Sequence, residues 1–148
     1  MTKQLNAQVD IDATAGQVWQ VLTDFAAYPE WNPFITRASG KAATGSQLEL
    51  RMQPVGGRGM NFRPTVVEAS PDRRLSWLGR LFVPGVFDGE HSFTIEPREG
   101  GGVRLVQREE FRGLLVPLMA KSLDRRTLPA FEQMNQALKR RAEGSTGA

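Results

Sequence analysis

The longest helical pattern of this chain lies near its C-terminus, over residues 115–141. Mostly apolar residues recur there at steps of three and four, so they share one face of a helix: Leu123, Thr127, Ala130, Phe131, Met134, Ala137 and Leu138. A helix with one apolar face needs an apolar surface to cover, which the rest of the chain must supply. Pro129 lies inside the pattern. Because proline has no N–H for the carbonyl of Arg125, we expect a kink over residues 125–129.

Most of the preceding sequence alternates between apolar and polar residues, as half-buried strands do. The clearest run covers residues 5–11, and others follow at 47–52, 61–68, 75–81, 87–96 and 103–111. Short turns separate the later runs, which favours antiparallel pairing. After the first strand, Thr14 and Gln17 match a capping box that begins a short helix, and residues 29–31 fit a second short helical turn. We therefore predict an α+β fold with a curved antiparallel sheet of about six to seven strands and the helices on one face.

The composition excludes several kinds of site. The 148 residues contain no cysteine and one histidine, so disulfides, thiolate-metal sites and zinc sites with several imidazoles are excluded. We expect no metal and no cofactor. No apolar run approaches the ~18 residues that cross a membrane, and no signal-peptide pattern is present, so we expect a cytoplasmic protein. We expect one domain over residues 1–142 and a flexible tail over residues 143–148.

Charge and short motifs exclude further classes. The net charge is only +3, and no basic stripe interleaved with aromatic residues is present, so no nucleic-acid partner is expected. The glycine-rich residues 56–59 do not begin a helix and lack a following Lys-Ser or Lys-Thr, so we interpret them as a hairpin connection and not as a phosphate loop. No Gly-x-Ser-x-Gly motif is present, which argues against a hydrolase nucleophile.

Four stretches of the chain carry a family resemblance. They are residues 28–35 (YPEWNPFI), 87–97 (FDGEHSFTIEP), 108–115 (REEFRGLL) and 131–138 (FEQMNQAL). Together with the order of the predicted elements, they resemble the START-like (SRPBCC) superfamily, and within it the polyketide cyclase/dehydrase and lipid-transport group. The resemblance covers nearly the whole chain and implies a helix-grip fold, in which the sheet wraps around the C-terminal helix and leaves an apolar cavity. Folds of this kind host ligand carriers and enzymes alike.

Strand parity predicts which polar side chains face such a cavity. His91 shares an apolar face with Phe93, and Gln107 and Glu109 share one with Phe111. Buried without partners, each polar group would cost about 1–3 kcal/mol. Three interpretations remain open: a structural cluster in which His91 bonds Glu109 or a backbone carbonyl, a polar patch that orients a ligand carbonyl or hydroxyl, and an acid–base pair of His91 and Glu109.

Aromatic residues at buried strand positions either line the cavity or belong to the core. We predict a ligand-binding set of aromatic, polar and helical residues: Trp31, Phe62, Trp77, Phe87, His91, Phe93, Gln107, Glu109, Leu123, Thr127 and Phe131. The part of the C-terminal helix before Pro129 is expected over the cavity mouth as its mobile half. The part after Pro129 is expected to be firmly packed.

These patterns support three hypotheses about function. The leading one is binding, and with it transport or sequestration, of a small hydrophobic or amphipathic molecule, without catalysis. The alternative is a polyketide-type cyclase, aromatase or dehydratase that uses His91 and Glu109 as acid and base. The third is a module that acts through its basic surface on a membrane face or an acidic partner, which the modest net charge disfavours. The oligomeric state, monomer or dimer, is left open.

Overall fold

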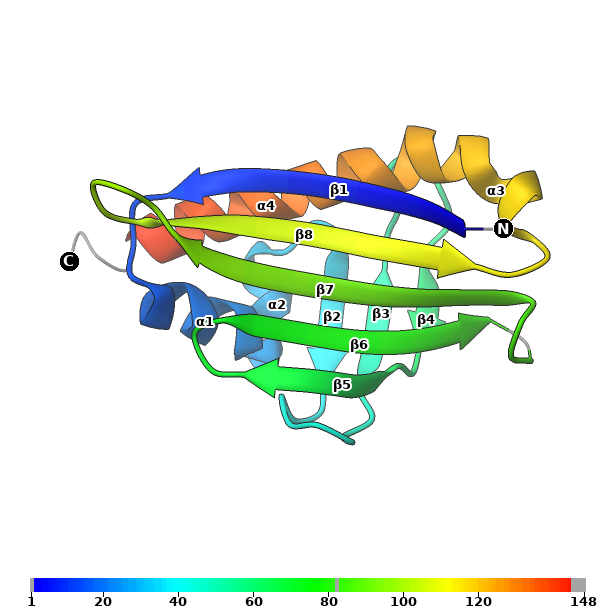
Figure 1. Cartoon of the computed structure of the whole chain (residues 1–148), viewed down its shortest axis with the longest axis horizontal. Helices are drawn as coiled ribbons and strands as arrows, with labels where there is room; N and C mark the ends of the chain where they lie inside the picture. The colour runs from blue at the N-terminus through cyan, green and yellow to red at the C-terminus, as the bar shows by residue number, and fades with distance from the viewer. Residues whose placement is uncertain (1, 82, 145–148) are drawn as a thin grey trace.

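The computed structural model describes residues 2–81 and 83–144. It confirms the α+β class and the helix-grip architecture predicted from the sequence (Figure 1). The elements before the long helix are β1 (Thr2–Ile11), α1 (Ala15–Thr23), the 3-10 turn η1 (Phe25–Ala27), α2 (Tyr28–Trp31), β2 (Ile35–Ser39), β3 (Glu49–Met52), β4 (Met60–Phe62), β5 (Thr65–Ser70), β6 (Arg74–Leu81), β7 (Phe87–Pro97) and β8 (Val103–Arg112). The long helix follows as α3 (Val116–Ser122), the π-helical turn η2 (Leu123–Thr127) and α4 (Leu128–Gly144).

The strands form two antiparallel sheets where we expected one. A five-stranded sheet has the order β1-β8-β7-β6-β5, and a three-stranded sheet has the order β2-β3-β4. The division falls inside the predicted strand 61–68, because β4 ends at Phe62 and β5 begins at Thr65. Pro64 lies between them and has no N–H to donate to a neighbouring strand. An isolated bridge between Gln47 and Thr65 keeps the two sheets in contact.

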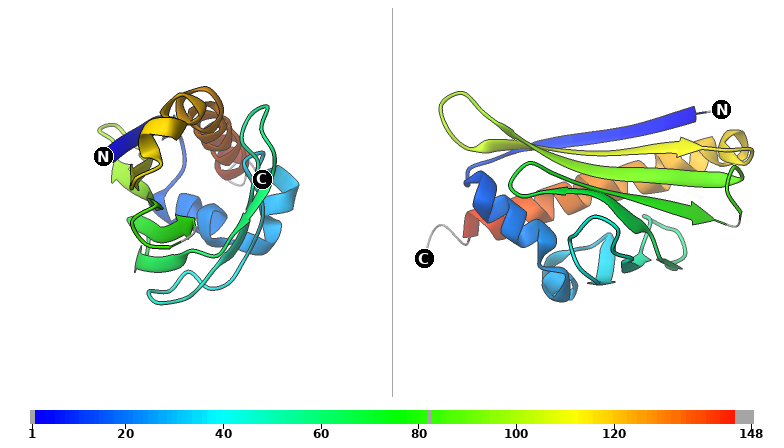
Figure 2. Two further views of the ribbon diagram at one scale, coloured as in Figure 1. Left: turned by 90° about the vertical axis from the view of Figure 1, so that its right-hand side faces the viewer. Right: turned by 60° about the horizontal axis from the view of Figure 1, so that its bottom comes forward.

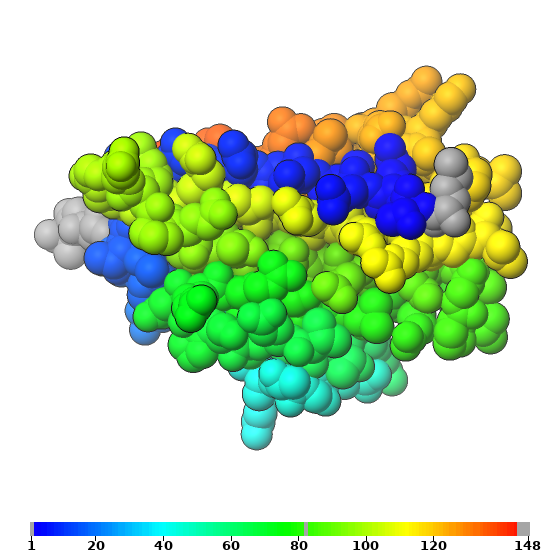
Figure 3. Space-filling view, viewed as in Figure 1, coloured from blue at the N-terminus to red at the C-terminus, as the bar shows by residue number. Residues whose placement is uncertain are grey.

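The long helix and the three-stranded sheet cover the same face of the five-stranded sheet (Figure 1). In the left view of Figure 2, these three layers surround the apolar core. The predicted strand parity is confirmed: the buried face of β7 includes His91 and Phe93, and that of β8 includes Leu105 and Gln107. The opposite face of this sheet, turned toward the viewer in Figure 3, carries exposed polar residues such as Arg108.

Local hydrogen bonds fix the connection between β1 and β2. The predicted capping box is present, since the Thr14 hydroxyl accepts from the Gln17 N–H at 3.1 Å and Gln17 Oε1 accepts from the Thr14 N–H at 2.8 Å. After α2, the buried Asn32 accepts through Oδ1 from the N–H groups of Phe34 and Ile35, at 3.0 and 2.9 Å. This side-chain turn directs the chain into β2 and places Phe34 in the core.

The C-terminal helix departs from α-helical geometry where a kink was predicted. In η2 the N–H of Leu128 bonds the carbonyl of Leu123, five residues earlier, so the turn directly before Pro129 is widened. A widened turn accommodates Pro129, which has no N–H to donate to the carbonyl of Arg125. The carbonyl of Arg126, within this turn, accepts a 3.0 Å hydrogen bond from the N–H of Val55. The connection between β3 and β4 is thereby attached to the helix.

Helix α4 reaches Gly144, so Glu143 and Gly144, which we expected in the tail, are helical. The carboxylate of Glu143 accepts from Lys139 at 2.6 Å and from the N–H of Asp12 at 2.8 Å. These bonds hold the pKa of Glu143 below its usual value, the lysine contributing most. Residues 145–148 lie outside the described part of the chain. Within the described part, no helix is long and apolar enough to cross a membrane.

Candidate functional site

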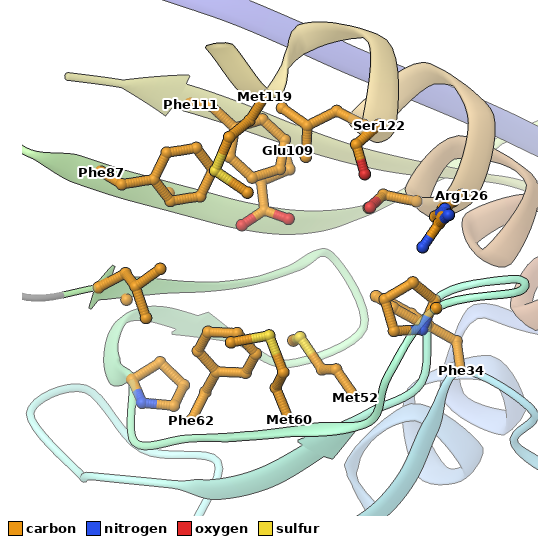
Figure 4. Close-up of a pocket in the computed structure, with 18 of the residues that line it drawn as sticks. Phe34, Met52, Met60, Phe62, Phe87, Glu109, Phe111, Met119, Ser122 and Arg126 are labelled. Carbon is orange, nitrogen blue, oxygen red and sulfur yellow. The ribbon is translucent and has the colours of Figure 1, made fainter. Parts of the chain in front are cut away.

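A partly open pocket of about 290 Å³ lies between the two sheets and the first part of the long helix (Figure 4). It occupies the end of the five-stranded sheet where β6 and β8 end and β7 begins. The volume is near the lower end of the ~300–1,000 Å³ typical of small-molecule sites. Most of the wall is apolar, and its residues are Phe34, Met52, Pro54, Gly57, Arg58, Met60, Phe62, Pro64, Trp77, Gly79, Arg80, Leu81, Phe87, Gly89, Glu109, Phe111, Met119, Ser122, Leu123, Arg126 and Thr127.

Two glycines on neighbouring strands form part of the floor. A Cβ added at Gly89 of β7 would lie 2.5 Å from Oε2 of Glu109, closer than real contacts allow. The missing side chain of Gly89 therefore provides the space that the Glu109 carboxylate occupies. At Gly79 of β6, the nearest atom to an added Cβ would be Pro64 Cβ at 3.6 Å, an ordinary contact. A side chain at position 89 would thus displace the Glu109 carboxylate from its present place, whereas one at position 79 would not.

Among the described residues, Glu109 provides the one carboxylate of the pocket wall, and its side chain is 13% exposed. Its Oε1 lies 3.2 Å from Nδ1 of His91, which is completely buried behind the wall. The two atoms do not meet hydrogen-bond geometry, so the contact is a close approach and not a hydrogen bond. The second oxygen, Oε2, lies on the side of Gly89. Figure 4 shows the carboxylate directed into the pocket.

A chain of buried hydrogen bonds extends from His91 to the long helix. The amide nitrogen of Gln107 lies 3.3 Å from the carbonyl oxygen of Phe131 and 2.7 Å from Oδ1 of Asn135. A main-chain carbonyl can only accept, so the group beside it must be the NH2 of Gln107. The oxygen of Gln107 then faces Nε2 of His91 at 2.9 Å and must accept from it. His91 therefore carries a proton on Nε2.

Glu109 supplies the pocket with a hydrogen-bond acceptor. Its Oε1 lies 3.2 Å from Nδ1 of His91 without the geometry of a hydrogen bond. A carboxylate oxygen accepts hydrogen bonds, and so does the carbonyl oxygen of a carboxyl group. Glu109 therefore offers an acceptor to a molecule in the pocket.

Aromatic rings enclose His91 on several sides. The ring centroids of Phe93 and Phe131 lie 4.9 Å from that of His91, that of Trp77 at 5.2 Å and that of Phe34 at 6.4 Å. Such packing excludes water from the imidazole and separates it from the pocket. Among the described residues that line the pocket, Glu109 is the one whose carboxylate approaches His91.

Cationic side chains lie at the more exposed side of the pocket. Arg58, from the connection between β3 and β4, and Arg126, from η2, are both exposed and line the pocket. Among the described residues, neither has a carboxylate within ion-pair distance. Arg80, by contrast, is paired with Asp88 at 3.7 Å. Figure 4 shows the guanidinium of Arg126 pointing into the pocket.

The residues predicted to bind a ligand are distributed between the pocket wall and the core. Those in the wall are Phe62, Trp77, Phe87, Glu109, Leu123 and Thr127. Those buried behind it are His91, Phe93, Gln107 and Phe131. Trp31 lies elsewhere, in a surface depression that includes Arg141. The structure brings the predicted acid–base residues His91 and Glu109 together, but only Glu109 lines the pocket.

Sequence reasoning missed part of the wall. Phe111 shares the face of Glu109 by parity and is one of the aromatic residues that could line the cavity, although the predicted binding set omits it. Met52, Met60 and Met119 are flexible apolar residues that adapt to irregular cavities, but they carry no positional signal of their own. The two arginines come from a loop and from the widened turn. The loop has no periodicity from which the direction of Arg58 could be inferred, and the helical pattern around Arg126 does not show where the turn widens. No group of described residues is arranged to hold a metal ion.

An antiparallel sheet that grips a long helix over an apolar pocket defines the START-like class of helix-grip proteins. The chain belongs to the family described as polyketide cyclase/dehydrase and lipid transport, whose model matches residues 2–143. The resemblance stated from the sequence is thereby confirmed.

Solved structures agree with the fold. The Zhui aromatase/cyclase from Streptomyces sp. R1128 superimposes with a TM-score of 0.80 at 16% identity, over 99% of this chain and 96% of that chain. A START superfamily protein from Mycobacterium smegmatis superimposes with a TM-score of 0.74 at 25% identity, over 96% of this chain and 98% of that chain. The di-domain aromatase/cyclase StfQ of the steffimycin pathway gives 0.79 at 13% identity, and this chain spans 53% of its length. No curated protein gives a significant match.

Proposed function

We propose that the protein binds a small hydrophobic or amphipathic ligand in the pocket between the five-stranded sheet and the long helix. The observation that carries this proposal is a cavity of about 290 Å³ with a mostly apolar wall and one carboxylate. Apolar surface buried there would contribute about 25 cal/mol per Å² to affinity. The family description, which includes lipid transport, supports the same class of ligand.

A direct test is to search for bound and binding molecules. Native mass spectrometry of the purified protein would detect a co-purifying lipid, and thermal shifts against fatty acids, polyprenyl quinones and polyketide-like aromatic compounds would detect binding. We expect at least one of these classes to raise the melting temperature in a concentration-dependent way. The absence of any bound species and of any stabilisation across the three classes would contradict the proposal.

Filling the pocket from the helix should abolish binding. Ser122 lies in the pocket wall at the end of α3, and Ser122→Trp would place a large ring in the cavity. We expect the affinity for any stabilising ligand to fall by about tenfold or more, with little change in stability because Ser122 is exposed. Lys121→Trp, at the neighbouring exposed position outside the wall, is the matched control. Equal ligand affinities of the two variants would place the ligand outside this pocket.

A second candidate function is acid–base catalysis on a polyketide-like substrate. The observation that favours it is the 3.2 Å approach of Glu109 Oε1 to Nδ1 of the buried His91, which is a second ionisable group directly behind the pocket carboxylate. Glu109 would be the group that exchanges a proton with the substrate, and His91 would be a positioning residue. Two of the three solved structures described above are aromatase/cyclases, which is the reaction class to assay first.

The catalytic candidate makes a specific prediction for position 109. Glu109→Gln keeps the shape of the side chain but cannot take up a proton, so any cyclisation or dehydration activity should fall by about 10²–10⁴-fold. Turnover of a poly-β-carbonyl substrate by the purified protein is the measurement. Glu110→Gln, the adjacent exposed-face carboxylate that pairs with Arg112, should leave the rate unchanged. Turnover that survives Glu109→Gln would exclude this mechanism.

A further inference from the structure

The pocket has two chemically different polar sides. One side carries an acceptor oxygen of Glu109 in a mostly apolar, buried wall, and the other carries the exposed cations Arg58 and Arg126. We infer that the ligand is an amphipathic acid, with an apolar body, a hydroxyl or similar donor directed at Glu109 and an anionic group directed at the two arginines. This inference deepens the proposed function and rests on it.

The anionic group follows from the unpaired guanidinium groups. Among the described residues, no carboxylate lies within ion-pair distance of Arg58 or Arg126, whereas Arg80 in the same wall is paired with Asp88. Two unpaired cations beside an apolar cavity attract an anion, and guanidinium groups bind carboxylates through paired hydrogen bonds. Because both side chains are exposed, the anionic group would remain partly solvated at the rim. Salt should therefore weaken its contribution.

The donor group follows from the acceptor oxygen of Glu109. This carboxyl group lines the pocket and retains an oxygen that accepts hydrogen bonds. A ligand carbonyl at this position would face another acceptor, whereas a hydroxyl, phenol or amine would donate to it. Burial strengthens this preference, because an unpaired polar group in the pocket would cost about 1–3 kcal/mol.

The two charged sides of the pocket do not neutralise each other. Glu109 and Arg126 both point into the cavity in Figure 4, but no ion pair joins them. Arg126 is also held by its main chain, because its carbonyl accepts from the N–H of Val55 and so ties the widened turn to the opposite rim. The pocket of about 290 Å³ accommodates a ligand of one or two fused rings or a single short chain.

Three matched probes separate the contributions of the two polar groups. The full chain is titrated calorimetrically with 6-hydroxy-2-naphthoic acid, 2-naphthoic acid and 2-naphthol. We expect the hydroxy acid to bind about tenfold more tightly than either probe that lacks one group. Arg126→Met should remove most of the affinity that the carboxylate adds, which is the difference between the hydroxy acid and 2-naphthol. The affinity that the hydroxyl adds, which is the difference between the hydroxy acid and 2-naphthoic acid, should remain. Arg125→Met, an exposed neighbour outside the wall, is the matched control and should change neither.

Variants of Glu109 test the inner contact. Glu109→Met should remove the advantage given by the hydroxyl. Glu109→Gln should retain most of it, since its amide NH2 can face His91 Nδ1 while its carbonyl oxygen still accepts. Raising the salt concentration should reduce only the carboxylate contribution. Circular dichroism of each variant confirms that a loss of selectivity is not a loss of folding.

The outcomes distinguish this inference from the function on which it rests. If all three probes bind the wild type equally, or if Arg126→Met and Glu109→Met leave the selectivity unchanged, the pocket binds apolar molecules but the amphipathic-acid inference is wrong. If no probe binds and no compound class stabilises the protein, the proposed function fails as well.

Discussion

Replacing Gln107 with leucine is expected to lower the free energy of unfolding by about 3 kcal/mol. The change leaves Nε2 of His91 and Oδ1 of Asn135 without their partner. It also removes a second hydrogen bond from the carbonyl of Phe131, which lies inside α4. Each group left unpaired costs about 1–3 kcal/mol, and the added apolar burial offsets part of that sum. Denaturation with guanidinium chloride, read by tryptophan fluorescence, measures the change.

The matched control lies one residue further along the same strand. Arg108 is exposed on the opposite face of the sheet, so Arg108→Leu should change the stability by no more than about 0.5 kcal/mol. A second test does not depend on stability. The buried proton that Nε2 of His91 donates to Gln107 should exchange slowly with solvent and should therefore give its own NMR signal. A Gln107→Leu protein as stable as the wild type would show that the buried chain does not stabilise the fold.

Trp77→Ala is expected to have a comparably large effect on stability and, in addition, to change the pocket. Trp77 is 2% exposed, packs against His91 and Phe93, and forms part of the pocket wall. Removing a buried tryptophan costs about 3–5 kcal/mol, and the vacated volume would join the cavity. We expect ligands larger than the best wild-type ligand to gain affinity relative to it, as measured by calorimetric titration.

Trp31→Ala is the control that distinguishes an effect on the pocket from a general loss of packing. Trp31 is partly buried and lies at the depression near Arg141, away from the pocket. Its removal should cost about 1 kcal/mol and leave ligand affinity and size preference unchanged. If Trp31→Ala weakens ligand binding while Trp77→Ala does not, the ligand occupies a different site.

The order of elements could be predicted because its signals are local. Alternation over residues 5–11 and the Thr14–Gln17 capping box each depend on residues within one element, and the structure contains both β1 and the box. The division into two sheets could not be predicted in the same way. Pro64 signals a possible interruption, but whether the chain continues in one sheet depends on which strands pair with each side of it. That pairing is set by distant residues.

The site was predictable by face but not by depth. Parity correctly placed His91, Gln107 and Glu109 on the inward side of β7 and β8. It could not show that Phe131 of α4 covers His91 and Gln107 while Glu109, further along the sheet, remains uncovered. Whether an inward side chain is covered depends on where the helix crosses the sheet. The sequence of a single strand carries no information about that position. Trp31 illustrates the same limit, since a four-residue helix has too few residues to define a face.

The three polar residues illustrate how one pattern supports two roles. Gln107 bonds both His91 and the long helix, so a buried polar cluster is present. The hydrogen bond to His91 comes from Gln107 and not, as we expected, from Glu109 or a backbone carbonyl, and Nδ1 of His91 has no hydrogen bond. Glu109 extends this cluster into the pocket, where the other two interpretations apply. The sequence left these interpretations as alternatives because it carries no information about which member of the group borders empty space.

The widened turn at Leu123–Thr127 also sets the rotational phase of the helix. Each residue of an α-helix advances by about 100° around its axis. Loss or gain of one residue in this turn would therefore rotate α3 by about 100° relative to α4, and Met119 and Ser122 would turn away from the cavity. No residue of α4 would need to change its packing against the sheet. The helical side of the pocket thus depends on the number of residues in one turn as much as on their identity.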